Sequence, residues 1–464
     1  MVRAQLYRKI IDMVPSRQPD ALTPHLYYKL IAANKGFLDT HLSRQPPVMN
    51  HNHLNYQVRL DFVHGLLREK FDLPENTKVE PIAYDPECPF KYNNFVYRIS
   101  LPSPLDKENG VCQSQPGCVA IPSGNSELIL RLTNSDAAGM GAADRVENEV
   151  AMITLAAAAL GPIFKPHVVP RLYDWVGSTS KQGKRQQGWI LQELMPGTPL
   201  DEKLDDMGLE EKKKIFAQIA KLLKGLQDFP LPASITQFGG LTFDNESNII
   251  SAPMTSTGKP TRTPTSRAGT RTDGVRARLE AFVERGLPAS FEPLESRDQK
   301  VIVHADFTPN NLLFDASSGY ITGLIDYDFS CILHPSYEFL RSFDGVGSQF
   351  RGWSGIEGRE QKALKEAKLH GFPDPLPDDK DGDNGVQWKV AKAWEDELEK
   401  AGCKRPMTIP GIDKVADVDA LLGSILPWRV TNSDILRRQT DEVIRNCRDE
   451  NEGVLIQILE HNGF

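Results

Sequence analysis

The composition of the chain is that of a folded globular protein with a large hydrophobic core. It has 464 residues, of which 40% are hydrophobic and 25% are charged. A chain of this length is expected to form two or three domains, or one bilobal enzyme with insertions. The formal net charge of −8 argues against a generally basic surface, so no nucleic-acid partner is expected.

The sequence also lacks the signatures of secretion, membrane insertion and zinc binding. No apolar run is long enough to span a bilayer, and the first residues lack the apolar core of a secretory signal. The six cysteines lack the paired spacing of a zinc finger, so we expect reduced thiols in a cytoplasmic protein without a membrane partner. A mitochondrial presequence is the weaker alternative, because Asp12 and Asp20 come early in the chain.

The first part of the chain is predicted to be helical. One helical stretch covers residues 26–42, and a second follows after two prolines. The second contains apolar residues at the i, i+4, i+8 spacing of one helix face. They are Val58, Phe62 and Leu66, with Val63 and Leu67 beside them. We expect this face to pack on a core.

A small β-sheet with one helix is predicted next. The strands are the apolar, β-branched runs at residues 95–101, 128–132 and 189–195. Residues 102–124 are rich in Pro, Gly and Ser and are predicted to form a long loop. Asn134 or Ser135 is expected to cap the helix that carries the apolar residues between Val146 and Ile153.

The remainder of the chain is predicted to be mainly helical. Residues 215–226 have a strongly amphipathic pattern, whereas residues 254–274 are predicted to form a surface loop, with an arginine-rich phosphate or partner patch as the alternative. The polar residues 362–411 are interpreted as an insertion between helices. Helical structure is expected again from residue 432.

These elements predict an α+β fold of three parts. They are an N-terminal helical extension (residues 1–80), a lobe with a small nucleotide-binding sheet and one helix (81–194), and a helical lobe with the catalytic loop and acceptor site (195–464).

The residues expected to carry chemistry lie around a predicted β-hairpin. His304, Asp306 and Asn311 occur in the run His-Ala-Asp-Phe-Thr-Pro-Asn-Asn, and Asp326 and Asp328 follow the second apolar strand. Phosphoryl transfer requires an oriented nucleophile and neutralised phosphate charge rather than covalent chemistry by the protein. An Asp beside the incoming hydroxyl meets the first need, and carboxylate and amide oxygens that hold Mg²⁺ meet the second. The pattern therefore indicates a phosphoryl-transfer site that uses a metal and a nucleotide.

This pattern resembles the catalytic-loop and metal-loop pair of the aminoglycoside phosphotransferase and choline kinase families, which are small-molecule relatives of protein kinases. The resemblance covers roughly residues 80–345. It implies a bilobal protein-kinase-like fold, with a small sheet in the first lobe and a mainly helical second lobe. It also implies ATP and Mg²⁺ as cofactors and a small-molecule hydroxyl as acceptor.

The resemblance also implies roles for individual residues. Asp306 would be the catalytic base, and His304 would brace its loop by hydrogen bonds. Asn311 and Asp326 would bind Mg²⁺, and Asp328 would contact a second metal or lie behind the first.

The nucleotide-binding part departs from the family pattern at the phosphate-binding cation. Arg131 stands on the strand where the family carries a Lys, and its fork can bind both phosphate and a carboxylate. Glu149 is the expected helix partner of this cation, with Glu147 as the rival and an exposed strand Arg131 as the alternative.

The phosphate-covering loop departs from the family as well, because the segment before residue 95 contains no Gly. Asn93, Asn94 and Lys91 are the candidate phosphate contacts there, since Asn tolerates left-handed backbone and its amide can donate. A plain turn is the alternative. Glu193 and Met195 mark the expected hinge, where backbone groups would bind adenine.

Function is therefore expected to be ATP-dependent phosphorylation of a small molecule. The alternative from another class is a nucleotide-binding pseudokinase or scaffold, which Arg131 and the Gly-free loop motivate. A protein kinase is disfavoured because the chain has neither Asp-Phe-Gly nor a later Ala-Pro-Glu. The acidic run at residues 374–399 is compatible with a cationic acceptor, although a solvated loop is the preferred interpretation.

Overall fold

The computed structural model describes most of the chain after residue 51. The described residues are 52–82, 88, 91–105, 115–137, 144–179, 186–255, 274–344, 349–355, 357–380, 385–425, 436 and 439–464. The predicted helix at 26–42, most of the loop at 254–274 and the first residues after 432 lie outside them.

A five-stranded antiparallel sheet forms the first lobe, in the order β1-β2-β3-β5-β4. Its strands are β1 (Lys78–Ile82), β2 (Asn94–Ser100), β3 (Glu127–Thr133), β4 (Leu172–Val176) and β5 (Trp189–Glu193). Helix α4 (Tyr56–Phe71) covers one face and α5 (Arg145–Leu160) covers the other. The three predicted strands are confirmed.

Alternation along β3 decides which side chains face each helix. Leu128, Leu130 and Leu132 belong to the apolar cluster under α4. Because successive side chains of a strand point to opposite faces, Arg131 lies on the α5 side. Its Cα partner Ile190 belongs to the cluster around α5. The pleat of β3 therefore directs this cation toward α5.

The predicted buried face of α4 is wrong by one position. Val58 is 66% exposed and Phe62 is 37% exposed, whereas Val63, Leu67 and Phe71 are buried against the sheet. Both stripes have i, i+4 spacing, so periodicity alone does not distinguish them. The position of the sheet decides the outcome.

The sheet lobe also begins earlier than expected. The boundary placed at residue 80 falls inside β1, which pairs with β2 from Lys78 onward. Helix α4 shares an apolar cluster with the sheet. The described residues from Asn52 therefore pack as part of this lobe.

The predicted cap of α5 is also wrong. The helix starts at Arg145 and its N-cap is Asp144. Asn134 instead accepts a hydrogen bond from the Asp136 amide at 3.1 Å and donates to the Tyr92 carbonyl at 2.7 Å. Asn side chains favour such local turns, which compete with helix capping.

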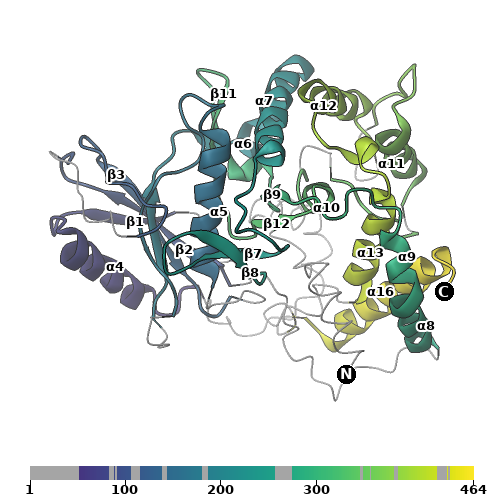
Figure 1. Ribbon diagram of the computed structural model, residues 1–464, viewed down its shortest axis with the longest axis horizontal. Helices are drawn as coiled ribbons and strands as arrows, with labels where there is room; N and C mark the ends of the chain where they lie inside the picture. The colour runs from purple at the N-terminus through teal and green to yellow at the C-terminus, as the bar shows by residue number, and fades with distance from the viewer. Residues whose placement is uncertain are drawn as a thin grey trace.

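The second lobe is mainly helical, as predicted. Its α-helices are α6 (Asp201–Leu204), α7 (Leu209–Asp228), α8 (Val275–Ala281), α9 (Leu287–Phe291), α10 (Ser336–Arg341), α11 (Arg359–His370), α12 (Trp388–Ala401), α13 (Ile412–Ile425) and α16 (Asp441–His461). Short π and 3₁₀ turns occur at η2 (Phe282–Gly286), η3 (Pro309–Asn311) and η4 (Pro406–Thr408). Figure 1 shows the sheet and α4 at one end of the molecule and α11, α13 and α16 at the other.

Small sheets lie among these helices. Strands β10 (Leu312–Asp315) and β11 (Tyr320–Leu324) form the predicted hairpin, and β6 (Thr198–Pro199) extends it. Strand β9 (Val301–Val303) pairs with β12 (Cys331–Leu333), and β7 (Gly240–Phe243) pairs with β8 (Ile249–Ala252). These pairs hold the loops that carry the candidate site.

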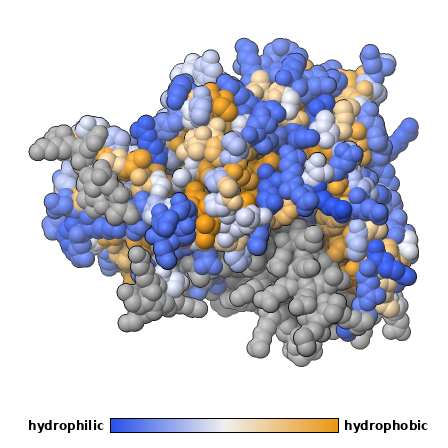
Figure 2. Space-filling model, viewed as in Figure 1, coloured by the Kyte–Doolittle hydropathy of each residue, from blue (hydrophilic) through white to orange (hydrophobic). Residues whose placement is uncertain are grey.

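The stretch 362–411 is not a mere polar insertion. It contains most of α11 and all of α12, whose Trp394 and Leu398 are fully buried beside α7. Figure 2 shows mainly hydrophilic side chains on the outer surface in this region. The charged outer faces of two amphipathic helices account for the polar composition. Among the described residues, no helix combines the length and hydrophobicity needed to cross a membrane.

The buried face of α4 can be tested by mutation. Leu67→Ala removes methyl groups from a side chain that is 2% exposed, so it should lower the free energy of unfolding. The expected loss is about 2–5 kcal/mol. Val58→Ala should change the unfolding free energy by less than about 0.5 kcal/mol. Chemical denaturation of both variants provides the measurement, and an equal loss in both would restore the originally predicted face.

Candidate phosphoryl-transfer site

The predicted catalytic loop, which contains His304, Asp306 and Asn311, follows β9 and is held by a buried carboxyl group from α10. Glu338 accepts hydrogen bonds from the His304 amide at 2.7 Å and the Ala305 amide at 2.9 Å. Ala305 has a φ of 62°, a left-handed conformation that costs a residue other than Gly about 1–3 kcal/mol. Burial raises the pKa of Glu338 to about 7. The contacts of Glu338 therefore support the backbone conformation that presents Asp306.

His304 joins the catalytic loop to the metal loop. The side chain is buried, and its Nε2 lies 3.1 Å from the Ile325 carbonyl oxygen. Burial lowers the pKa of His304 to about 4, so the ring is neutral at pH 7 and Nε2 carries the donated proton. The geometry is compatible with the bracing role expected for His304.

Asp306 and Asn311 form a hydrogen-bonded pair at the centre of the site. The Asn311 Nδ2 donates to Asp306 Oδ2 at 2.8 Å and to the Asp306 carbonyl at 2.9 Å. Burial, and then the negative charge of Asp326, raise the pKa of Asp306 above its ordinary value. A carboxylate with a raised pKa is better matched to accepting a proton near neutral pH.

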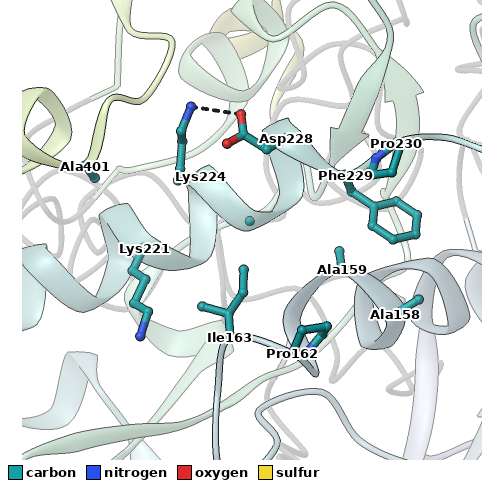
Figure 3. A pocket seen from close by; sticks show the side chains of 11 residues that line it. Ala158, Ala159, Pro162, Ile163, Lys221, Lys224, Asp228, Phe229, Pro230 and Ala401 are labelled. Atoms are coloured by element: carbon teal, nitrogen blue, oxygen red, sulfur yellow. Dashed lines mark hydrogen bonds and ion pairs between the residues drawn. The ribbon is translucent and has the colours of Figure 1, made fainter.

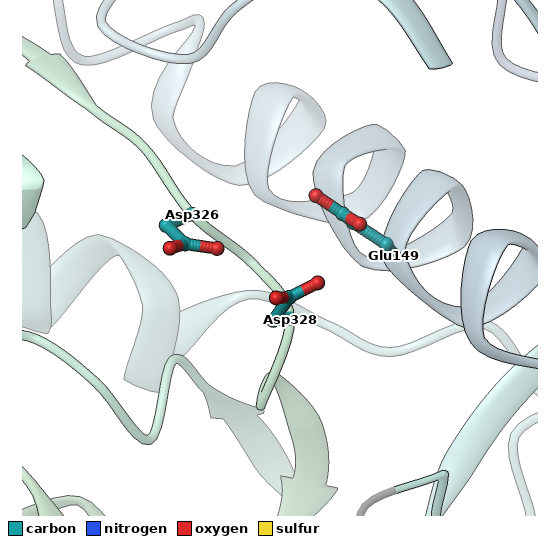
Figure 4. Close-up of side chains that lie close together, drawn as sticks. All are labelled: Glu149, Asp326 and Asp328. Carbon is teal, nitrogen blue, oxygen red and sulfur yellow. The ribbon is translucent and has the colours of Figure 1, made fainter. Parts of the chain in front are cut away.

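The predicted metal loop, which contains Asp326 and Asp328, follows β11 of the β10–β11 hairpin. The Ile325 amide donates to the Asn311 carbonyl at 2.9 Å, which fixes the loop relative to Asn311. Asp326 has a φ of 65°, and its side chain is 40% exposed. Figure 4 shows Asp326 and Asp328 on this loop and Glu149 on α5, and their ligand atoms lie within 4.8 Å of one another.

Arg131 lies among these three carboxylates. Its Nη2 is 2.8 Å from Asp326 Oδ1, 3.1 Å from Glu149 Oε1 and 3.5 Å from Asp328 Oδ1. Glu149 is thus the helix residue paired with Arg131, whereas Glu147 accepts a hydrogen bond from Thr242 at 2.6 Å. Arg131 is buried, so the alternative of an exposed strand Arg is wrong.

A second buried arginine, Arg145, was not among the residues singled out from the sequence. Its Nη2 donates to Asp328 Oδ2 at 2.8 Å and to Asn94 Oδ1 at 2.9 Å, and its Nη1 donates to the Asn93 carbonyl at 2.9 Å. Asn94 Nδ2 also donates to Asp328 Oδ2 at 2.8 Å. Arg145 precedes Glu149 by four residues, so both share one helix face. This i, i+4 spacing was the feature of the sequence that could have indicated Arg145 as a neighbour of Glu149.

Asn94 and Asp328 therefore have protein partners in the positions where phosphate and metal contacts were expected. Burial opposes ionisation of Asp328, but Arg145 and Arg131 outweigh it and lower the pKa of Asp328 to about 2. Asp328 is an ionised counterion of two arginines. A direct metal contact would have to compete with both.

The expected hinge follows β5. The Glu193 carboxylate lies 2.7 Å from His167 Nε2 and accepts a hydrogen bond from the Arg171 amide at 3.1 Å. The Glu193 amide donates to the Arg171 carbonyl at 2.9 Å, so it is already used within the lobe. Met195 is buried. Of this pair, the backbone of Met195 is the better candidate for binding adenine.

The residues around Asp326 fit a magnesium ion. Mg²⁺ binds through one or two carboxylates, with phosphate oxygens and water completing its shell. Asp326 is the exposed carboxylate of the cluster. Asn311, the last residue of η3, carries an amide oxygen that accepts a hydrogen bond from Asn310 at 2.9 Å. The third carboxyl group, that of buried Glu149, faces Arg131 Nη2 at 3.1 Å. This donor set is of the oxygen type that Mg²⁺ prefers.

A separate cavity of about 520 Å³ lies between the ends of α5 and α7 and includes none of the site residues. Its wall is mainly apolar, with Ala159, Ile163 and Phe229 among its lining residues. The charges of Lys224 and Asp228 pair with each other at 2.8 Å (Figure 3).

The model of the phosphotransferase enzyme family matches residues 119–393, which is more than half of the chain and includes Arg131, Asp306 and Asp326. A search of curated protein sequences finds no match.

Solved structures also align with this chain over most of their length. A thermostable mutant of aminoglycoside phosphotransferase APH(4)-Ia has 13% identity and a TM-score of 0.39, with 86% of this chain and 98% of the other covered. Spectinomycin phosphotransferase APH(9)-Ia, in complex with ADP and spectinomycin, has 12% identity and a TM-score of 0.40 at 87% and 97% coverage. Plasmodium vivax ethanolamine kinase has 12% identity and a TM-score of 0.36 at 93% and 94% coverage. Similarity at this level leaves the substrate open.

The family match identifies a phosphotransferase, and the structure has an α+β architecture with a sheet lobe and a mainly helical lobe. The chain belongs to the phosphotransferase enzyme family. The family resemblance and the fold class predicted from the sequence are thereby confirmed.

The position of Arg131 generates a test of nucleotide binding. Arg131→Ala should weaken ATP binding roughly 10-fold to 100-fold, because a charge-assisted hydrogen bond contributes about 1.5–3 kcal/mol. Arg131→Lys should retain most of the affinity, since Lys keeps the charge. Calorimetric titration with MgATP measures both. Equal affinity in all three proteins would remove Arg131 from the binding site.

Proposed function

We propose that this protein is an ATP- and Mg²⁺-dependent kinase that transfers the γ-phosphoryl group to a hydroxyl of a small molecule. The observation that carries the proposal is the joint placement of Asp306, Asn311 and Asp326. Hydrogen bonds connect the first two, and the Asn311 carbonyl fixes the loop of the third. Phosphoryl transfer needs this combination of a base and oxygen ligands around one point.

The base in this proposal is Asp306. It accepts the proton of the acceptor hydroxyl while the hydroxyl oxygen bonds to the γ-phosphorus. The bond from the γ-phosphorus to the β–γ bridging oxygen breaks, and ADP carries that electron pair away. The Asn311 amide holds Asp306 Oδ2 and so orients the carboxylate toward the acceptor. His304 stays neutral and keeps the two loops in register.

The nucleotide phosphates would meet Arg131 and the metal site. Asn311 and Asp326 are the proposed Mg²⁺ ligands, and a bound Mg²⁺ would neutralise charge on the phosphate oxygens. Arg131 would then exchange its contact with Asp326 for phosphate oxygens, while Glu149 keeps the guanidinium oriented. Asp328 is proposed not to bind the metal directly but to hold Arg131 and Arg145 in place. The hinge at Met195 is the proposed adenine contact.

A transfer screen tests the proposal directly. The full chain with MgATP is incubated with amino-alcohols, sugars and aminoglycosides, and products are identified by mass. We expect one class to gain the mass of a phosphoryl group with stoichiometric ADP release. Nucleotide binding without turnover across the panel would favour the scaffold alternative.

Two carboxylate variants should fail in different ways. Asp306→Asn should reduce turnover by at least about 100-fold, as expected for loss of a general base, with MgATP affinity nearly unchanged. Asp326→Ala should lose both turnover and the Mg²⁺ dependence of nucleotide binding. Circular dichroism establishes that both variants are folded. Residual Mg²⁺-dependent turnover in Asp326→Ala would refute the metal assignment.

The pH profile should report the environment of Asp306. A base must be ionised to accept a proton, so kcat/KM should fall as pH drops through its pKa. Because burial raises the pKa of Asp306, this acid limb should lie above the pH at which an exposed Asp titrates. The positive charge of Arg341 lowers the same pKa, so Arg341→Gln should move the limb to still higher pH. An unchanged limb would show that another group controls it.

A further inference from the structure

Arg145 connects three separate parts of the site. It is the first residue of α5, and its side chain is almost fully buried. Its guanidinium group binds the Asn93 carbonyl, the Asn94 side chain and Asp328 at 2.8–2.9 Å. We refer to Arg145, Asn93, Asn94 and Asp328 as the Arg145 clasp. The clasp joins the segment before β2, the start of α5 and the metal loop.

The clasp also fixes the segment in which the family resemblance leads one to expect a glycine-rich loop. Asn134 adds two further contacts, because its amide donates to the Asn93 carbonyl at 2.9 Å and its Nδ2 donates to the Tyr92 carbonyl at 2.7 Å. Glycine-rich loops follow phosphates through backbone freedom. Here, side-chain hydrogen bonds fix the end of the loop instead.

Charge balance makes the clasp relevant to Arg131. The cluster contains two buried guanidinium groups, Arg131 and Arg145, and three carboxyl groups, of which Glu149 and Asp328 are buried and Asp326 is partly exposed. If Arg145 lost its charge, Asp328 would keep the hydrogen bond from Asn94, but its only remaining cationic partner among the described residues would be Arg131 at 3.5 Å. Buried carboxylates require a counterion, so Asp328 would draw Arg131 toward itself. Arg131 would then be displaced from Glu149 and from the phosphates.

We propose that Arg145 is a positioning residue for phosphoryl transfer, which holds the loop before β2 and the metal loop together and leaves Arg131 available to the nucleotide. This inference rests on the proposed kinase function for its effect on turnover. The mechanical connection between the two loops does not depend on that function. The two parts can therefore be tested separately.

The kinetic experiment compares Arg145→Gln, Asp328→Asn and the double variant in the full chain. Each single variant should lower kcat/KM for ATP about 10-fold or more, as loss of a charge-assisted contact predicts. The double variant should be little worse than either single one, because both remove the same contact. Arg145→Lys, which keeps the charge but not the fork, should restore part of the activity.

The matched control is Arg405→Gln. Arg405 is also a buried arginine, paired with buried Glu395 at 2.6 Å, but it lies in the helical lobe between α12 and α13. Its loss should lower stability while changing kcat/KM for ATP less than about 3-fold, since it is a separate site. A loss of activity in Arg405→Gln equal to that in Arg145→Gln would mean that general destabilisation explains both.

Hydrogen exchange tests the connection without nucleotide. In Arg145→Gln, amides near Asn94 and amides near Asp328 should both exchange faster, and Arg405→Gln should leave both unchanged. Asn94→Ala, which leaves no buried charge without a counterion, should reproduce the change near Asp328. Faster exchange confined to the start of α5, or strictly additive kinetic effects, would overturn the proposal. If the wild-type protein neither binds nor turns over ATP, the kinase function fails, and the exchange result alone decides on the clasp.

Discussion

The placement of the buried Arg131 guanidinium among three carboxylates is the contact on which the rest of the site depends. Glu149 belongs to α5, whereas Asp326 and Asp328 belong to the loop after β11. The two lobes therefore meet through charge as well as through apolar packing. Removing one partner of a buried ion pair costs about 3–5 kcal/mol, because an uncompensated charge remains. The relative position of α5 and the metal loop is set by this requirement.

The predicted catalytic loop is also held by a buried carboxyl group, that of Glu338. Ala305, directly before Asp306, adopts a left-handed backbone, and Glu338 binds the amides on both sides of the Cα atom of His304. His304 then carries the constraint to the Ile325 carbonyl, next to Asp326. Two strained backbone positions, at Ala305 and Asp326, are thus supported by hydrogen bonds from buried groups around them. Such strain near a site is compatible with function, since it presents side chains at fixed positions.

The sequence predicted contacts between residues that are close in the chain. Asp306 and Asn311 are five residues apart and contact each other. The choice between Glu147 and Glu149 as the partner of Arg131 was left open by the sequence, and the structure pairs Arg131 with Glu149. The sequence did not reveal the contact between Arg145 and Asp328, which are 183 residues apart. Periodicity also did not identify the buried face of α4, because two adjacent apolar stripes of the helix have the same spacing. Both features depend on packing between residues that are far apart in the sequence.

The two departures from the family pattern meet in this same cluster. Arg131 replaces the expected Lys, and its contact Asp328 is held by Arg145, which in turn binds the Gly-free segment at Asn94. A glycine-rich loop would present few side chains for Arg145 to bind. In this chain, Arg145 donates hydrogen bonds to the Asn94 side chain and the Asn93 carbonyl, and these contacts fix the segment. An Arg in β3 can serve several carboxylates where a Lys offers a single compact charge. The larger cation and the segment without glycine are therefore physically connected, through the contacts of Asp328 and Arg145.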